Sequence, residues 1–312
     1  MHGSPCAPVL APCLEPDEQG RHLRGQSARL WKLGQGQGIL VLAECPPSMS
    51  FFRLQQEQLR AFEEDGFLLV PNLLNAEEVS LLRRITEGVV RSDPHRLDRH
   101  DAKGRKTLLS LRNELCDDMY STLVRCERIA RTMEALLGDE VYHYHHKVMI
   151  KEPKMGGAWE WHQDYGYWYE NGCLRPDMAS CMIAITPATK ANGCLEVIPG
   201  SHRLGRIDHV ERHGQVCADP ERVEQICERL GVRDVEIDPG DGLFFHSNLL
   251  HRSQQNLSDD SRLSVINCFN TKSNNPVKEH HHPGYSPLDI CPDEEVLTSG
   301  ARQWQSLSEN ME

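Results

Sequence analysis

Hydrophobic residues follow a helical spacing up to about residue 138 and form short, strand-like runs after it. An apolar run at residues 67–70 (FLLV) predicts a buried strand. A capping-box start at Asn75–Glu78 opens one helix, and a further helical stretch is predicted from about Asp117 to Leu137. A helix before the first strand is predicted from three apolar residues and a terminal glycine: Leu54, Leu59, Phe62 and Gly66.

The second part of the chain predicts a set of short strands separated by turn signals rich in Gly, Pro, Asn and Asp. One helical insert, at about residues 220–230, interrupts them. Helices followed by strands indicate an α+β domain built around an antiparallel sandwich or barrel. The apolar runs predicted as strands are 141–150, 179–185, 194–198, 235–237, 243–245 and 263–269.

The first fifty residues have a different texture, with Pro, Gly, Gln and Cys in no periodic order. We interpret residues 1–50 as a flexible N-terminal extension without an assigned function. Its acidic residues argue against a mitochondrial transit peptide, which is normally poor in acid. One folded domain is predicted over residues 51–295, followed by a C-terminal tail over 296–312.

Composition narrows the class of protein. The chain has 312 residues, 39% of them hydrophobic and 26% charged, which is typical of a soluble globular protein. No apolar run reaches the roughly 18 residues that a membrane span needs. The formal net charge of −12 argues against binding of nucleic acid. Twelve cysteines without a CxxC pair, and no signal peptide, predict reduced thiols in a cytoplasmic protein.

Candidate chemistry begins at Trp161-His162-Gln163-Asp164. In an extended segment, residues two apart point to the same side, so His162 and Asp164 can bind one metal ion together. Two ligands do not make a site, and a short H-x-D match arises easily by chance. A third ligand from elsewhere would complete the facial triad of two histidines and one carboxylate.

The third ligand is expected about ninety residues downstream, where a Pro-Gly-Asp-Gly turn and an apolar strand precede two histidines. Either His246 or His251 could close the triad. Arg262, at the start of the next strand, offers a bidentate fork for a carboxylate. A metal with three protein ligands beside such an arginine predicts a keto-acid cosubstrate.

Several longer motifs accompany these residues. They are W-H-Q-D at 161–164, N-G-C-L-E-V-I-P-G-S-H at 192–202 and G-D-G-L-F-F-H-S-N-L-L-H-R-S at 240–253. Two further motifs open the domain, Q-L-R-A-F-E-E-D-G-F at 58–67 and L-L-N-A-E-E at 73–78. Together these motifs resemble the phytanoyl-CoA dioxygenase family. The resemblance covers about residues 52–290 in the right order.

The resemblance implies a double-stranded β-helix, a cupin-like jelly roll with the N-terminal helices packed outside. It implies that residues 51–295 form an Fe(II)- and 2-oxoglutarate-dependent dioxygenase domain, with O2 as the oxidant and ascorbate as a stimulant. Hydroxylation of the substrate would release succinate and CO2. The implied iron ligands are His162, Asp164 and His251, and the implied cosubstrate contacts are Arg262, Ser253 and Lys147.

The substrate is the open part of this hypothesis. Tyr165 and Trp168 flank the metal motif and fit either a substrate wall or core packing. The acidic chain lacks a C-terminal S-K-L signal, which favours a small amino-acid-like metabolite over an acyl-CoA. The alternatives are an acyl-CoA 2-hydroxylase, a non-catalytic binding or sensor protein, and a zinc or manganese cupin enzyme. The tract His280–His282 is interpreted as a solvated loop. A monomer and a homodimer both fit the sequence.

Overall fold

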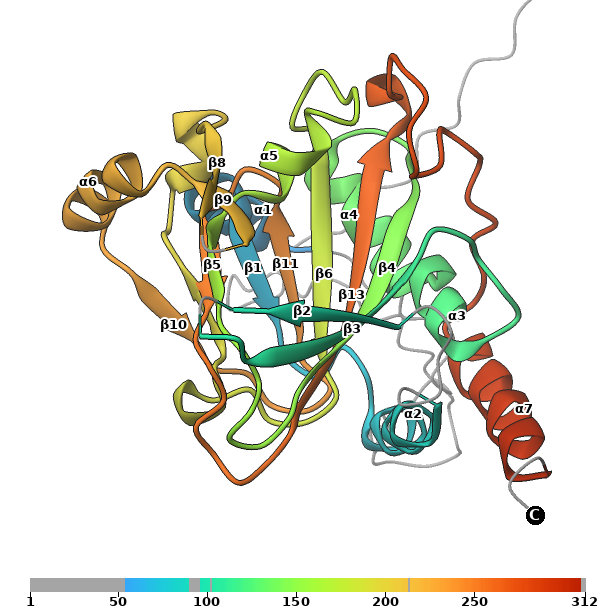
Figure 1. Cartoon of the computed structure of the whole chain (residues 1–312). Helices are drawn as coiled ribbons and strands as arrows, with labels where there is room; N and C mark the ends of the chain where they lie inside the picture. The colour runs from blue at the N-terminus through green and yellow to red at the C-terminus, as the bar shows by residue number, and fades with distance from the viewer. Residues whose placement is uncertain (1–53, 90–95, 102, 213, 310–312) are drawn as a thin grey trace, which may run out of the picture. The chain divides into compact units, whose positions relative to one another are not determined.

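The structure, a computed structural model, describes residues 54–89, 96–101, 103–212 and 214–309 (Figure 1). The predicted extension over residues 1–50 lies outside the described residues, so it stays a prediction. The helices are α1 (Gln56–Asp65), α2 (Ala76–Val89), α3 (Met119–Arg125), α4 (Glu127–Leu137), α5 (Asp164–Trp168), α6 (Pro220–Leu230) and α7 (Glu295–Glu309).

The strands pair in antiparallel fashion and form a seven-stranded sheet, a four-stranded sheet and a separate hairpin. The larger sheet has the order β1-β11-β6-β13-β4-β3-β2, the smaller one β10-β7-β12-β5, and the hairpin joins β8 to β9. The strands are β1 (Phe67–Val70), β2 (Arg96–His100), β3 (Lys106–Arg112), β4 (Val141–Lys151), β5 (Trp159–His162), β6 (Met178–Ala184), β7 (Leu195–Val197), β8 (His209–Arg212), β9 (Gln215–Ala218), β10 (Arg233–Val235), β11 (Gly242–His246), β12 (His251–Ser253) and β13 (Arg262–Thr271).

The N-terminal elements follow local sequence signals closely. Gly66 ends α1 in a left-handed conformation, with φ of 82°, and β1 follows at once. Asn75 caps α2, because its Oδ1 accepts the backbone N–H groups of Glu77 and Glu78. Glu78 Oε2 accepts the Asn75 N–H in return, at 2.8 Å, which completes the predicted capping box.

The prediction of a single helical stretch from Asp117 to Leu137 is wrong in one respect. The structure divides it into α3 and α4 at Cys126, whose backbone is extended, with φ of −65° and ψ of 144°. Cys126 forms an isolated parallel bridge with Cys291, and the Glu127 N–H donates to the Cys291 carbonyl oxygen. A partner 165 residues further along the chain therefore interrupts the helix, and helical spacing contains no sign of it.

Alternating side chains give the larger sheet two apolar faces. One face packs against the helices, and the other packs toward the four-stranded sheet. Met149, Met182 and Ile266 belong to the second face, while Val148, Ile183 and Val265 belong to the first. Helices therefore cover one face of a two-sheet β sandwich, the arrangement expected of a jelly roll with helices outside (Figure 1).

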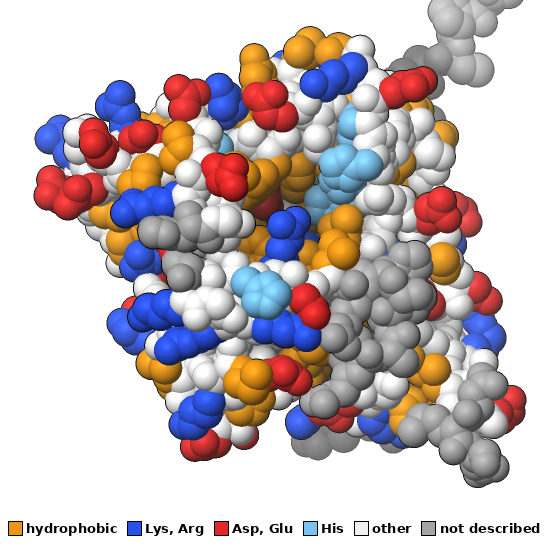
Figure 2. All heavy atoms as spheres, viewed as in Figure 1, with side chains coloured by type: hydrophobic (Ala, Val, Ile, Leu, Met, Phe, Trp, Pro, Cys, Tyr) orange, Lys and Arg blue, Asp and Glu red, His pale blue; other side chains and the backbone are white. Residues whose placement is uncertain are grey.

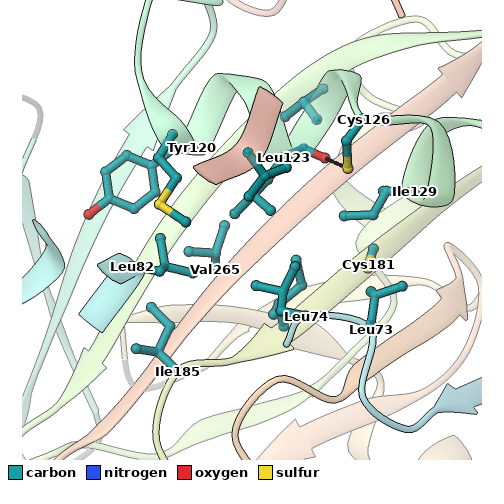
Figure 3. Close-up of a cluster of buried hydrophobic side chains, with 14 of the residues drawn as sticks. Leu73, Leu74, Leu82, Tyr120, Leu123, Cys126, Ile129, Cys181, Ile185 and Val265 are labelled. Carbon is teal, nitrogen blue, oxygen red and sulfur yellow. Dashed lines mark hydrogen bonds between the residues drawn. The ribbon is translucent and has the colours of Figure 1, made fainter. Parts of the chain in front are cut away.

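The core between the helices and the larger sheet is continuous. Figure 3 shows Leu82 of α2 and Leu123 of α3 directed toward Val265 of β13 and Ile185 after β6. Helix α7 also joins this core through Val296. It occupies most of the segment predicted as a C-terminal tail. None of the helices within the described ranges is both long and apolar enough to cross a membrane.

Leu82→Ala is expected to lower the free energy of unfolding by about 2–5 kcal/mol, because it removes a fully buried side chain and leaves a cavity. Leu257→Ala is the matched control. The Leu257 side chain is 58% exposed, so we expect a change within about 0.5 kcal/mol. Urea unfolding of both variants measures the difference. Equal losses in the two variants would contradict the assigned core.

Candidate active site

Three side chains converge where β5 and β12 meet: His162 at the end of β5, Asp164 at the first position of α5 and His251 at the start of β12. His251 is the register partner of His162, so strand pairing brings their ring centroids to 4.1 Å. The Nε2 atoms of His162 and His251 lie 3.9 and 4.0 Å from Asp164 Oδ1. Among the described residues, this buried triad is the one group placed to share a metal ion.

Backbone carbonyl groups fix the orientation of both imidazoles. His162 Nδ1 lies 2.8 Å from the Glu160 carbonyl oxygen, and His251 Nδ1 lies 2.9 Å from the Leu249 carbonyl oxygen. A carbonyl oxygen only accepts hydrogen bonds, so each Nδ1 carries the proton. Each Nε2 therefore presents a lone pair to the common centre, as a metal ligand must.

The charge state of the triad also suits a metal ion. Burial alone would raise the pKa of the Asp164 carboxyl, yet the charge of Lys147 and a hydrogen bond from Ser180 help to hold it below its usual value. Burial lowers the pKa of both His162 and His251, so their rings are neutral at pH 7. One carboxylate and two neutral imidazoles form the donor set of non-haem Fe(II) oxygenases.

His246, the other histidine that the sequence left open, does not belong to this group. Its Nδ1 accepts the Asn248 backbone N–H at 3.0 Å. Its ring packs near Phe62 and His202, with centroid distances of 6.4 and 5.2 Å. The structure thus places His246 against α1 and the loop after β7, and His251 in the triad.

The residue between the first two triad members ties the metal loop to its surroundings. Gln163 is fully buried, and its Nε2 donates to the carbonyl oxygens of Gly205 and Asn248, each at 2.8 Å. Its Oε1 accepts the Ile207 N–H at 2.7 Å, and its own backbone N–H donates to His209 Nε2 at 3.1 Å. The bond to Asn248 links the loop of Asp164 to the turn that precedes His251.

We expect Gln163→Met to weaken Fe(II) binding by about 10- to 100-fold, the usual range for residues that support metal ligands. Methionine preserves the volume but loses all three side-chain hydrogen bonds. Asn270→Met is the matched control, because Asn270 is an equally buried amide that bonds Tyr142 and Asn274 instead. Fe(II) titration by equilibrium dialysis should separate the two variants. A similar loss of affinity in both would show that Gln163 has no specific role.

A buried pair of cations lies at the predicted cosubstrate position. Arg262, the predicted carboxylate partner, is the register partner of Lys151 across β13 and β4. Lys151 Nζ donates to Ser253 Oγ at 2.8 Å and also to the Gln254 carbonyl oxygen. Arg262 Nη1 donates to the Gly193 carbonyl oxygen, whereas its Nε has no partner in the described part of the chain.

The electrostatics of this pair are unusual for a protein interior. Burial lowers the pKa of Arg262 to about 10, and burial with repulsion from Arg262 lowers that of Lys151. No carboxylate of the described residues lies within ion-pair distance of either side chain. Buried cations are normally paired, so the site is suited to a carboxylate supplied by a ligand.

A cavity of about 870 Å³ opens on His162 and Asp164 of the triad, and the hollow in the face shown in Figure 2 has histidine, Lys and Arg side chains around it. His162, Asp164, Lys147 and Trp168 line it. Tyr165 is buried instead, and its hydroxyl donates to the Cys173 carbonyl oxygen at 3.1 Å. Of the two aromatic residues predicted for a substrate wall, the structure therefore places Trp168 at the cavity.

The histidine tract contributes to the same cavity, which the interpretation as a solvated loop missed. His281 is exposed, but His282 is half-buried, and both line the cavity. His282 stacks on His145 of β4. A bulge in β4 opposite β13 skips Tyr144 in the pairing register. Because a bulge directs neighbouring side chains to one face, it accounts for Tyr144 and His145 both packing against His282.

The chain is similar to proteins of known function. The sequence profile "Phytanoyl-CoA dioxygenase (PhyH)" matches residues 62–264. The chain belongs to the phytanoyl-CoA dioxygenase family. It is 31% identical to L-proline trans-4-hydroxylase of Streptomyces griseoviridis over 248 residues, which cover 74% of this chain and 91% of that protein. It is 30% identical to ectoine dioxygenase of Bordetella parapertussis, over 74% of this chain and 80% of that protein.

Solved structures confirm the jelly-roll fold of this family member. The structure of EctD from S. alaskensis with bound Fe matches with a TM-score of 0.65 and 24% identity, over 77% of this chain and 88% of that one. Family membership and the triad together make the chain an Fe(II)- and 2-oxoglutarate-dependent dioxygenase. The triad is the set of residues that fits its iron.

Proposed function

We propose that the chain hydroxylates a small amino-acid-like metabolite and releases succinate and CO2 from 2-oxoglutarate. The cavity beside the triad carries this proposal. A zwitterionic substrate is best bound where acidic and basic side chains both line the site, and both kinds line this cavity. Two relatives are, by name, an L-proline hydroxylase and an ectoine dioxygenase. Besides Asp164 of the triad, the charged residues that line the cavity are Asp98, Asp101, Glu160, Glu170, Arg99, Lys147 and Arg206.

The cosubstrate is proposed to bind between the triad and the buried cations. Iron held by the triad supplies the redox chemistry, and the protein positions the reactants around it. Arg262 pairs with the distal carboxylate of 2-oxoglutarate, and Ser253 contacts the same end. Lys151, which donates to Ser253, is added to this set. Lys147, on the same strand face but at the cavity, is proposed as a further contact with the cosubstrate.

The substrate itself is proposed to lie over the triad against Trp168, whose indole is part of the cavity wall. Tyr165 supports that wall from behind, since it packs in the same apolar cluster as Trp168. The proposed partner of the protein is thus a small molecule bound in this cavity.

The free state of all nine described cysteines supports a reducing, cytoplasmic location.

The test is a panel of amino acids, cyclic amino acids and acyl-CoA thioesters, assayed for stimulation of 2-oxoglutarate decarboxylation by the full chain with Fe(II). An amino-acid-like compound is expected to stimulate succinate formation in an O2-dependent way. Stimulation by an acyl-CoA alone would support the acyl-CoA 2-hydroxylase alternative. Iron binding without any succinate formation would support a sensor. Turnover without O2 would support a zinc or manganese cupin enzyme.

A further inference from the structure

The loop that follows β13 brings an imidazole to the cavity in a fixed position. The ring of His282 packs against both Tyr144 and His145, with centroid distances of 4.7 and 4.5 Å. The His145 ring is nearly parallel to it, at 23°, and lies edge-on to Trp168 at 5.7 Å. Stacking of this kind restrains both ring tilt and ring position, so His282 is a rigid part of the wall.

The protonation of His282 is set by Asn113, the residue that follows β3. Asn113 Nδ2 donates to the His281 carbonyl oxygen at 2.8 Å, so Asn113 Oδ1 is the atom 2.7 Å from His282 Nδ1. An amide oxygen only accepts, and therefore His282 Nδ1 carries a proton. Burial and the neighbouring histidines lower the pKa of His282 to about 3, so the ring is neutral at pH 7. In a neutral ring with a proton on Nδ1, Nε2 is a hydrogen-bond acceptor.

This acceptor is available to a ligand, because His282 Nε2 has no hydrogen-bond partner among the described residues and its ring lines the cavity. We propose that His282 Nε2 accepts a hydrogen bond from an N–H or O–H group of the substrate and thereby selects substrates with a donor at this wall. A carboxylate or phosphate there would meet a lone pair without a proton to share. The inference rests on the proposed function, since it names the group that the same site recognises.

The test compares pairs of compounds in which one member has a hydrogen-bond donor and the other has none at the same atom, such as L-proline with N,N-dimethyl-L-proline and an alcohol with its methyl ether. Substrate-stimulated 2-oxoglutarate decarboxylation is measured for the wild type, His282→Phe, Asn113→Leu and His202→Phe. Phenylalanine keeps the stack but lacks Nε2, so His282→Phe should lower kcat/KM for the donor-bearing member about 10-fold. It should change the methylated member little, and Asn113→Leu should act in the same direction. His202→Phe is the control and should preserve the preference, because His202 packs near His246 and is not among the residues that line the cavity.

Imidazole 15N correlation spectra of the full chain give a second measurement that is independent of any substrate. They should show His282 protonated at Nδ1 in the wild type and a mixture of tautomers in Asn113→Leu. A His282 ring protonated at Nε2, or a wild-type enzyme that uses both members of each pair equally, would overturn the inference. Failure of every donor-bearing parent to stimulate would remove the proposed substrate class and the inference together. Consumption of 2-oxoglutarate in the absence of substrate is measured as well, and it shows separately whether the protein is an active oxygenase.

Discussion

Asp164→Ala is expected to abolish 2-oxoglutarate turnover and to weaken Fe(II) binding by more than about 100-fold, beyond the usual effect of residues that only support metal ligands. Asp164 supplies the one negative charge of the triad, and its removal leaves two neutral imidazoles to hold a dication. The measurements are succinate formation and the charge-transfer absorption that develops when Fe(II) and 2-oxoglutarate are added without O2.

The control for this variant is Asp241→Ala. Asp241 is also a buried carboxylate, in the turn before β11. Its oxygens accept the backbone N–H groups of Asp238 in the same turn and of Asn72, which follows β1. We expect Asp241→Ala to lower the melting temperature while Fe(II) affinity stays at the wild-type value. Wild-type iron affinity in Asp164→Ala would mean that the metal is held by other residues.

The sequence indicated His162 and Asp164 because the determinants of this pair are local. His162 and Gln163 are extended, so the two-residue spacing directs His162 and Asp164 toward one point even though Asp164 already begins α5. The choice between His246 and His251 was different. It depends on the antiparallel pairing of β12 with β5, and a three-residue strand such as β12 has too little pattern to be recognised alone.

The spacing of Lys151 from Lys147 is a sequence signal for a buried lysine that the sequence analysis missed. It lies four residues after Lys147 in β4, and residues at even spacing along a strand share a face. Met149 between them packs in the cluster between the sheets, which confirms the direction of that face. Alternation along β4 thus directs Lys151 to the interior, where a lysine is exceptional, but the strand predicted from the sequence ended at residue 150. Only the pairing of β4 with β13 shows that its neighbour is Arg262.

The position of His282 lies beyond any local pattern. It depends on the bulge in β4, on the Asn113 side chain and on the path of an irregular loop, which are contacts between distant parts of the chain. A run of three histidines without periodicity is equally compatible with a solvated tract. Packing against Tyr144 and His145 decides its environment in this protein.

Arg262→Met is expected to raise the dissociation constant of 2-oxoglutarate by more than about 100-fold while Fe(II) remains bound, because truncating one partner of a buried charge pair costs on the order of 2–5 kcal/mol. Methionine approximates the volume of the arginine stem and removes the guanidinium. It also removes a buried guanidinium that has no carboxylate partner in the described part of the chain, so we expect the protein without cosubstrate to melt at a higher temperature than the wild type. Thermal unfolding with and without 2-oxoglutarate measures both effects.

Arg252→Met is the matched control for this last prediction. Arg252 belongs to β12, between His251 and Ser253, but its Nε donates to Glu196 at 2.6 Å, so its charge is already paired within the protein. This variant leaves the carboxylate of Glu196 buried without its partner and should melt at a lower temperature, with an unchanged 2-oxoglutarate dissociation constant. The two arginines are thus expected to shift stability in opposite directions and affinity in only one case. An unchanged cosubstrate affinity in Arg262→Met would refute the carboxylate site.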